Sequence, residues 1–285
     1  MRLITFEHDG VVQHGVVDGD EIAVIGTGDL AAVVAGAVAA PNGSRIPLAD
    51  VRALAPVLRP GKVLAVAANY QEHVTESGSK PRDVVTASPR LFLKPDTSVV
   101  GDEAEVELAA ITTQFDWEAE LAVVIGRTAR EVAVTDALDV VFGYATSNDL
   151  SARSLALDAP RDGEVWTGFF DWLEGKWLDG SAPIGPYLVT ADDVPDPQRL
   201  AVTLTLNGET RQSGSTADMI HSVAELVAFS SRLMTLNPGD VILTGTPAGV
   251  GATTGTFLKP GDVLVTEVEG LGALTTRIVA PHADS

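Results

Sequence analysis

The chain contains no cysteine among its 285 residues. This absence excludes disulfide bonds, zinc–thiolate sites and a catalytic thiol, so any chemistry must come from other side chains. Long apolar runs are also missing, because no stretch approaches the about 18 consecutive apolar residues that a transmembrane helix needs. Glu7 and Asp9 interrupt the first ten residues, where a signal peptide would continue its apolar segment. We therefore expect a cytoplasmic protein.

Positive charge is scarce as well. Lys and Arg number 19 against 39 Asp and Glu, which gives a formal net charge of −20 and a pI near 4.4. Such a chain repels nucleic acids and anionic membranes, so we expect neither as a partner. The sequence also lacks a P-loop, a dinucleotide-binding fingerprint and the Gly-x-Ser-x-Gly elbow of a serine nucleophile.

The rest of the composition is that of a globular protein with a large core, since 45% of the residues are hydrophobic. Pro56 and Pro60-Gly61 mark a boundary, which divides the chain into a small N-terminal domain at 1–57 and a larger domain at 58–285. Helical patterns occupy residues 30–40, 135–138 and the stretch from about Thr216 to Met234. Few helices and many short strands predict an α+β, β-rich fold and not a doubly wound sheet.

Two carboxylates lie one residue apart in the segment 116–125 (DWEAELAVVI). The segment is apolar and β-branched, which predicts a strand. Because strand side chains alternate, Glu118 and Glu120 would share one face about 7 Å apart, close enough to grip one divalent cation. A solvated strand face is the alternative, since acidic side chains are usually exposed.

A third carboxylate, Asp149, follows another predicted strand at 144–147. Three carboxylates with waters completing the shell suit Mg²⁺ or Mn²⁺, and an all-oxygen ligand set argues against zinc. The alternative is a simple turn at Asn148-Asp149, because both residue types favour turns.

His73 and Glu76 follow the predicted buried strand 62–67. If the chain is helical there, the two side chains lie on one face and can hydrogen-bond. A carboxylate that orients an imidazole and raises its basicity makes a general base for activating water. A surface His–Glu pair is the other interpretation of this spacing. The polar segment from Thr75 to Arg90 has the length of a lid.

Two cations and a glycine-rich loop are further candidates. Arg153 lies four residues after Asp149 and could pair with a substrate carboxylate or with a nearby acid. Lys176 could likewise pair with a substrate carboxylate or with a nearby acid, and a solvated lysine is the alternative. The segment 244–251 (TGTPAGVG) would bring backbone N–H groups close to a ligand.

Five separated motifs occur in the order found in the fumarylacetoacetate hydrolase family, which the chain resembles: 69–76 (NYQEHVTE), 116–121 (DWEAEL), 143–153 (GYATSNDLSAR), 175–186 (GKWLDGSAPIGP) and 238–247 (PGDVILTGTP). The resemblance covers roughly residues 60 to 281. The leading 57 residues resemble the small N-terminal domain of many bacterial members.

The resemblance implies a rolled, mixed β-sheet core and a homodimer. It places the ligands of Mg²⁺, Mn²⁺ or Ca²⁺ on Glu118, Glu120 and Asp149. It places a catalytic dyad on His73 and Glu76, in a lid segment that orders when substrate binds. Positions that hold substrate carboxylate and keto oxygens match Arg153, Lys176 and Thr246, and Tyr70 is predicted to bind substrate with them.

The activity implied by the resemblance is metal-dependent hydrolysis of a C–C bond in a small diketo acid of the acylpyruvate, fumarylpyruvate or 2,4-diketo sugar acid type. An oxaloacetate-type decarboxylase or an enol–keto tautomerase or isomerase with the same metal site is the alternative, and a catalytically silent metal-binding protein is a third hypothesis. The chain departs from the family at Ser154-Leu155-Ala156, where Asp-x-Gln is common, so a substrate-contacting glutamine is missing. The segment 163–172 (GEVWTGFFDW) is also longer and more aromatic, and we expect it to form a different wall for the substrate.

Overall fold

The structure is a computed structural model that describes residues 1–83, 86–156 and 163–281. Strands predominate, which confirms the α+β, β-rich prediction. They are β1 (Arg2–His8), β2 (Val11–Asp18), β3 (Glu21–Thr27), β4 (Arg45–Pro47), β5 (Arg52–Leu54), β6 (Val63–Ala67), β7 (Arg90–Lys94), β8 (Val99–Val100), β9 (Ala104–Glu107), β10 (Phe115–Asp116), β11 (Ala119–Ile125), β12 (Val141–Asn148), β13 (Ser151–Ala152), β14 (Ala182–Thr190), β15 (Ala201–Leu206), β16 (Glu209–Ser215), β17 (Val241–Leu243), β18 (Val263–Val268) and β19 (Gly272–Val279).

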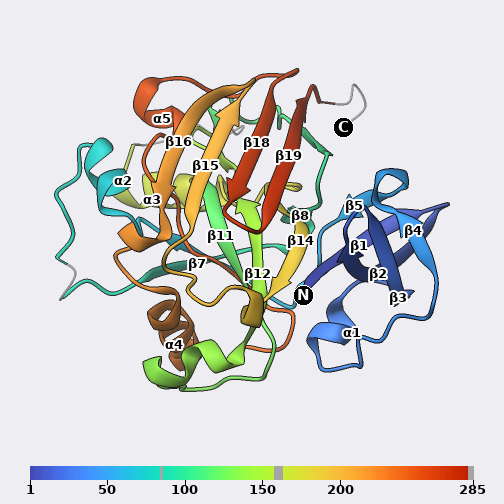
Figure 1. Cartoon of the computed structure of the whole chain (residues 1–285). Coiled ribbons are helices and arrows are strands. Elements are labelled where there is room, and N and C mark those ends of the chain that lie inside the picture. Colours follow the sequence, from blue (N-terminus) through green and yellow to red (C-terminus); the bar gives the residue numbers. More distant parts are fainter. Residues whose placement is uncertain (84–85, 157–162, 282–285) are drawn as a thin grey trace.

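The strands form a twelve-stranded sheet, a five-stranded sheet and the two-stranded pair β10-β13. The large sheet has the order β4-β3-β2-β1-β14-β12-β11-β17-β6-β7, with β5 added on β1 and β8 on β14. It is mixed, since β11 and β12 are antiparallel whereas β17 and β6 are parallel. The second sheet has the order β16-β15-β18-β19-β9, and its orange and red strands pack across β11 and β12 (Figure 1).

The α-helices of the described residues are α1 (Ala31–Val34), α2 (Gln71–Glu76), α3 (Val165–Glu174), α4 (Val223–Leu233) and α5 (Gly251–Thr254). Short 3₁₀-helices occur at Leu48–Asp50, Asp96–Ser98, Val134–Val140, Ala191–Asp193 and Thr216–Asp218. No helix within these described ranges has the length and apolar composition needed to cross a membrane.

Two of the predicted helices are shorter than expected. The helix predicted at 30–40 ends at Val34, because Gly36 adopts a left-handed conformation with φ 100° that an α-helix cannot continue. The long helix predicted from about Thr216 begins only at Val223. Before it, Met219 forms an isolated β-bridge with Tyr70 and the Ile220 N–H donates to the Asn69 carbonyl oxygen, so tertiary pairing overrides the helical pattern.

β11 is buried on both faces, and this burial decides where its acidic side chains point. Its odd-numbered residues from Leu121 to Ile125 belong to a core shared with the five-stranded sheet and α4. Even-numbered residues such as Ala122 belong to a second core, which includes residues of β6, β7 and α3. Glu120, and Glu118 just before the strand, share this even-numbered face.

The first 57 residues contribute β1 to β5 and α1, drawn in blue in Figure 1. β1 pairs with β14 through Arg2–Val189 and Leu3–Leu188. The N-terminal strands therefore extend the large sheet beyond β14. The division of the chain into domains at residue 57 remains a prediction.

Candidate metal centre and active site

Antiparallel pairing of β11 with β12 brings the three predicted carboxylates together. Ala119 lies opposite Asn148, and the N–H of Asp149 donates a 2.8 Å hydrogen bond to the carbonyl oxygen of Glu118. One carboxylate oxygen from each of Glu118, Glu120 and Asp149 lies within 4.8 Å of the others. All three side chains are buried, so the alternative of a solvated strand face is wrong.

Among the described residues, three cations contact two of these carboxylates. Lys94 Nζ lies 2.6 Å from Asp149 Oδ1, and Lys176 Nζ lies 2.7 Å from Asp149 Oδ2. Lys176 Nζ also lies 3.0 Å from Glu118 Oε2, and Arg153 donates to Glu118 Oε1 at 2.6 Å. Lys176 is therefore a buried ion-pair partner and not a solvated lysine, and Arg153 pairs with a nearby acid.

The surroundings shift the pKa values of the two glutamates in opposite directions. Burial would raise the pKa of Glu118, but Lys176 and Arg153 outweigh it and hold that pKa well below its usual range. The pKa of Glu120 lies well above its usual range, because burial and the charges of Asp149 and Glu118 oppose its ionisation.

Among the described residues, Glu120 is the carboxylate of the cluster that lacks a cationic partner. Within residues 1–83, 86–156 and 163–281, no Lys, Arg or His forms an ion pair with it, and one oxygen accepts a 2.7 Å hydrogen bond from the Gly245 N–H. A buried carboxylate in this state favours a bound positive charge. The all-oxygen donor set fits a hard divalent cation, so this cluster can hold a divalent metal ion.

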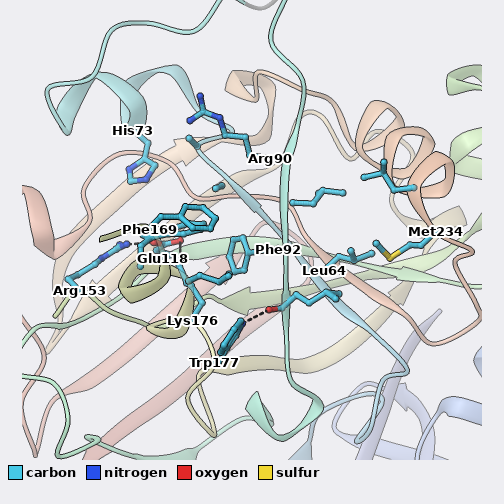
Figure 2. Close-up of a pocket in the computed structure, with 17 residues that line it drawn as sticks. Leu64, His73, Arg90, Phe92, Glu118, Arg153, Phe169, Lys176, Trp177 and Met234 are labelled. Atoms are coloured by element: carbon cyan, nitrogen blue, oxygen red, sulfur yellow. Dashed lines mark hydrogen bonds and ion pairs between the residues drawn. The ribbon is translucent and has the colours of Figure 1, made fainter. Parts of the chain in front are cut away.

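The carboxylate cluster borders a cavity of about 780 Å³. Glu118, Arg153 and Lys176 line it together with His73 from α2, and Figure 2 shows these side chains gathered on one side of the cavity. The structure therefore brings four of the predicted site residues around one space.

α2 places the predicted dyad as the spacing indicated. His73 Nδ1 lies 2.7 Å from Glu76 Oε1. Glu76 Oε2 accepts a 2.8 Å hydrogen bond from the N–H of Gly249, so the glycine-rich loop fixes the carboxylate. Donation from Nδ1–H to Glu76 leaves Nε2 of His73 as the basic nitrogen. Each side chain is only 18% exposed, which argues against a solvated surface pair.

Tyr70 and Thr246 are not among the described residues that line the cavity. The Tyr70 phenol is buried, and burial together with the charge of Glu120 raises its pKa. Thr246 Oγ1 accepts a 2.8 Å hydrogen bond from Gln212 Nε2. A direct contact of either residue with substrate stays a prediction. Of the predicted lid, residues 84 and 85 lie outside the described residues.

Two side chains that support the site were missed by the sequence analysis. Lys94 contacts Asp149 from β7, and Asp116 Oδ2 accepts a 2.9 Å hydrogen bond from Arg153 Nε. Asp116 Oδ1 also accepts from the N–H of Gly251 at 2.6 Å. A lysine inside the apolar run 91–95 (LFLKP) was the available signal, since a buried ammonium needs an acidic partner.

The segment that departs from the family pattern forms part of the cavity. Residues 163–172 form most of α3, to which the sequence analysis assigned no element, and Phe169 and Trp172 from this helix line the cavity. The Ala156 N–H, at the position of the missing glutamine, donates to the Ile111 carbonyl oxygen at 2.6 Å.

Comparison with known families agrees with the motifs. A family model described as "Fumarylacetoacetate (FAA) hydrolase C-terminal" matches residues 62–279. The chain belongs to the fumarylacetoacetate hydrolase family. A second model, described as "Rv2993c-like, N-terminal", matches residues 1–56. Family members include hydrolases, isomerases and a tautomerase, so the family is one of enzymes.

Individual relatives carry different activities in their names. The human protein named mitochondrial oxaloacetate tautomerase FAHD2A is 41% identical over 236 residues, which cover 82% of this chain and 71% of the relative. The fumarylacetoacetate hydrolase structure from Exiguobacterium antarcticum has a TM-score of 0.84 and 36% identity, covering 99% of this chain and 100% of that one. The maleylpyruvate hydrolase structure from Sphingobium sp. SYK-6, in complex with manganese(II) and pyruvate, has a TM-score of 0.74, 30% identity and the same coverage.

Proposed function

We propose that this protein is a divalent-metal-dependent hydrolase that cleaves a C–C bond in a small diketo acid of the acylpyruvate, fumarylpyruvate or 2,4-diketo sugar acid type. The observation that carries the proposal is the position of His73, which is paired with Glu76 and lines the same cavity as Glu118. A related structure contains manganese(II) and pyruvate, which supports a metal and a keto acid as ligands here.

Glu118, Glu120 and Asp149 would hold Mg²⁺ or Mn²⁺, with Ca²⁺ as a further candidate. When bound there, the cation supplies a Lewis acid for the keto oxygens of the substrate. Arg153 and Lys176 contribute positive charge on the same side of the cavity, where they would orient the substrate carboxylate and stabilise negative charge on the departing enolate.

His73 acts as the general base in this mechanism. Its Nε2 takes a proton from water, and the hydroxide oxygen bonds to the acyl carbon distal to the carboxylate. The bond between that carbon and the methylene then breaks, and its electron pair stays on the methylene carbon as the pyruvate enolate. The proton returns from His73 to this carbon, so acylpyruvate and water give a carboxylic acid and pyruvate.

An activity screen tests the proposal. Acetylpyruvate, other small diketo acids and oxaloacetate are supplied with Mg²⁺ or Mn²⁺, and a chelator serves as the control. We expect acylpyruvate cleavage that requires the metal and is lost in His73→Ala. Cleavage that continues unchanged in chelator would rule out the metal-dependent mechanism.

Enol–keto tautomerisation or decarboxylation of oxaloacetate-like acids is the second candidate. The human relative's name, oxaloacetate tautomerase, favours it. The same cations would stabilise an enolate formed without attack by water. If oxaloacetate is converted and no acylpyruvate is cleaved, this candidate replaces hydrolysis; tight Mn²⁺ binding without turnover of any keto acid would instead support a silent metal-binding protein.

Assembly and location are part of the same proposal. We propose a homodimer in the cytoplasm, in line with the resemblance and the composition, with the catalytic part in residues 58–285. The predicted lid at Thr75–Arg90 would close over the bound keto acid. Size measurement in solution tests the dimer directly.

A further inference from the structure

We propose that the substrate carries an apolar alkyl or aryl acyl group, which lies along Phe92, Phe169 and Trp172 and points towards Leu64 and Met234. This inference rests on the proposed function, because it takes the carboxylate side of the cavity as the place where the keto acid reacts. It adds the substrate class, which the carboxylate cluster and the dyad do not define.

The cavity has a charged side and an apolar side. Figure 2 shows His73, Glu118 and Arg153 on one side and Leu64 and Met234 on the opposite side. Among the described residues, the lining beyond the charged side chains is apolar, and it includes Leu64, Ala67, Leu91, Phe92, Trp172 and Leu233. A ligand that binds at the charged side and extends across the cavity therefore meets hydrocarbon surface.

Aromatic side chains begin at the charged side, where Figure 2 shows Phe169 beside Glu118, and continue to Phe92, which lies between the charged side and Leu64. Phe92 lies 5.3 Å from Lys176 Nζ, measured to the ring centroid, so the apolar wall begins directly beside the charged residues. The Phe92 and Trp172 rings pack edge to face at 5.2 Å, and Phe169 follows 6.0 Å from Trp172. Leu173, next to Trp172, also lines the cavity, and the spacing 169, 172 and 173 puts one face of α3 towards the ligand space.

The size of the cavity agrees with an extended substrate. Pockets of about 300–1,000 Å³ hold drug-sized ligands, and this cavity measures about 780 Å³. A keto acid of only a few carbons would leave much of that space empty. An apolar acyl group would fill it and remove both its own surface and that of the wall from water.

Arg90 is the side chain that favours a competing substrate class. It lines the cavity outside the carboxylate cluster and is exposed, so it could bind a second carboxylate on a dicarboxylic substrate. The apolar lining formed by the described residues outweighs this exposed cation, because burying a carboxylate against hydrocarbon is costly. An apolar acyl group predicts a higher kcat/KM for benzoylpyruvate than for fumarylpyruvate, and a dicarboxylic substrate predicts the reverse.

The experiment compares kcat/KM for acetylpyruvate, hexanoylpyruvate, benzoylpyruvate and fumarylpyruvate with Mn²⁺. We expect kcat/KM to rise about fourfold for each of the first added methylenes, and benzoylpyruvate to be preferred over fumarylpyruvate. Phe169→Ala should lower the ratio of hexanoylpyruvate to acetylpyruvate about tenfold. Phe170→Ala is the matched control, since Phe170 neighbours Phe169, is similarly exposed (49% against 46%) and is not among the described lining residues.

A second variant tests the far side of the cavity. Leu233 lines the cavity and is 58% exposed, so Leu233→Gln should fold and should lower kcat/KM for hexanoylpyruvate more than for acetylpyruvate. Equal kcat/KM for all acyl groups would overturn the inference. So would a preference for fumarylpyruvate that Arg90→Gln removes.

Binding without turnover separates this inference from the proposed reaction. Calorimetry on the Mn²⁺-loaded protein compares oxamate with N-phenyloxamate, which presents the same chelating atoms and adds an aryl group. We expect N-phenyloxamate to bind at least tenfold more tightly, and Phe169→Ala to remove the difference while Phe170→Ala keeps it. If this holds and no acylpyruvate is cleaved, the reaction is wrong and the apolar site stands. Equal affinities would overturn the apolar site whatever the reaction.

Discussion

The backbone N–H of Asp149 donates a 2.8 Å hydrogen bond to the carbonyl oxygen of Glu118. The bond joins the residue just before β11 to the residue just after β12, so one carboxylate from each strand enters the same buried space. Glu120 lies two residues along β11 on the face of Glu118. Backbone pairing therefore sets the positions of all three carboxylates, and these ligands are preorganised.

Replacing Glu120 with Gln should abolish Mn²⁺ binding and leave the metal-free protein at least as stable as the wild type. The variant removes a buried carboxylate that has no ion-pair partner in the part of the chain that the structure describes, and the Gln oxygen can still accept from the Gly245 N–H. Thermal denaturation with and without Mn²⁺ measures both effects. At about 100 times its Kd, Mn²⁺ should stabilise the wild type by about 2.7 kcal/mol.

The control for this variant is Glu105→Gln, which changes an exposed carboxylate on β9. It should keep the full stabilisation by Mn²⁺. Wild-type Mn²⁺ affinity in Glu120→Gln would show that the cluster is not the metal site.

Replacing Lys94 with Met should destabilise the metal-free protein by about 1–3 kcal/mol, because it removes one partner of a buried ion pair while Lys176 still pairs with Asp149. Mn²⁺ affinity should rise, since one cation no longer competes for the Asp149 carboxylate. Urea denaturation and Mn²⁺ titration measure these effects. Lys62→Met is the control, because Lys62 pairs with Asp240 at 2.6 Å in a more exposed position. Weaker Mn²⁺ binding in Lys94→Met would contradict the competition between lysine and metal.

Replacing Glu76 with Gln should lower kcat about tenfold to a hundredfold with little change in KM. Gln can still accept from the Gly249 N–H, but it loses the charge that orients His73 and stabilises its protonated form. Steady-state kinetics on an acylpyruvate measure both constants. Glu72→Gln, on the exposed side of α2, should behave as the wild type. An unchanged kcat in Glu76→Gln would exclude the dyad.

The wild-type, metal-free protein should lose free energy of unfolding in mild acid because of His221. Burial and the charge of Arg82 lower the pKa of His221 below its ordinary value of 6.5, so the unfolded chain takes up a proton at a higher pH than the folded protein does. The contribution of His221 to the free energy of unfolding is fully present above about pH 6.5. It is lost as the pH falls from there through the folded-state pKa. His221→Gln should therefore lose less free energy of unfolding than the wild type between about pH 7.5 and 5.5.

Urea denaturation at the two pH values checks this prediction, and His8→Gln controls for the loss of one histidine from a more exposed position. A parallel loss of stability in the wild type and in His221→Gln would show that other groups carry the acid sensitivity.

The parts of the site that depend on local spacing were predictable from the sequence. Glu118 and Glu120 share a face because strand side chains alternate, and His73 meets Glu76 because residues three apart are neighbours on a helix. The family's motif order supplied Asp149, which spacing alone allowed to be a turn residue.

Contacts between distant segments were not predictable in this way. Lys94 reaches Asp149 from β7, which is not adjacent to β12 in the sheet. The start of α4 was misplaced because Asn69 hydrogen-bonds the Ile220 and His221 backbone and holds that segment out of the helix. The missed Lys94 contact and the misplaced start of α4 both arise from tertiary contacts, which the periodicity of the sequence does not encode.

The measurement that tests the central claim most directly is product analysis of acylpyruvate turnover in ¹⁸O-labelled water with Mn²⁺ and with chelator. We expect equal amounts of pyruvate and carboxylic acid, one ¹⁸O atom in the new carboxylate of that acid, and no products in chelator. Conversion to an enol–keto isomer or to carbon dioxide without pyruvate and acid, or label-incorporating cleavage that continues in chelator, would contradict metal-dependent C–C hydrolysis.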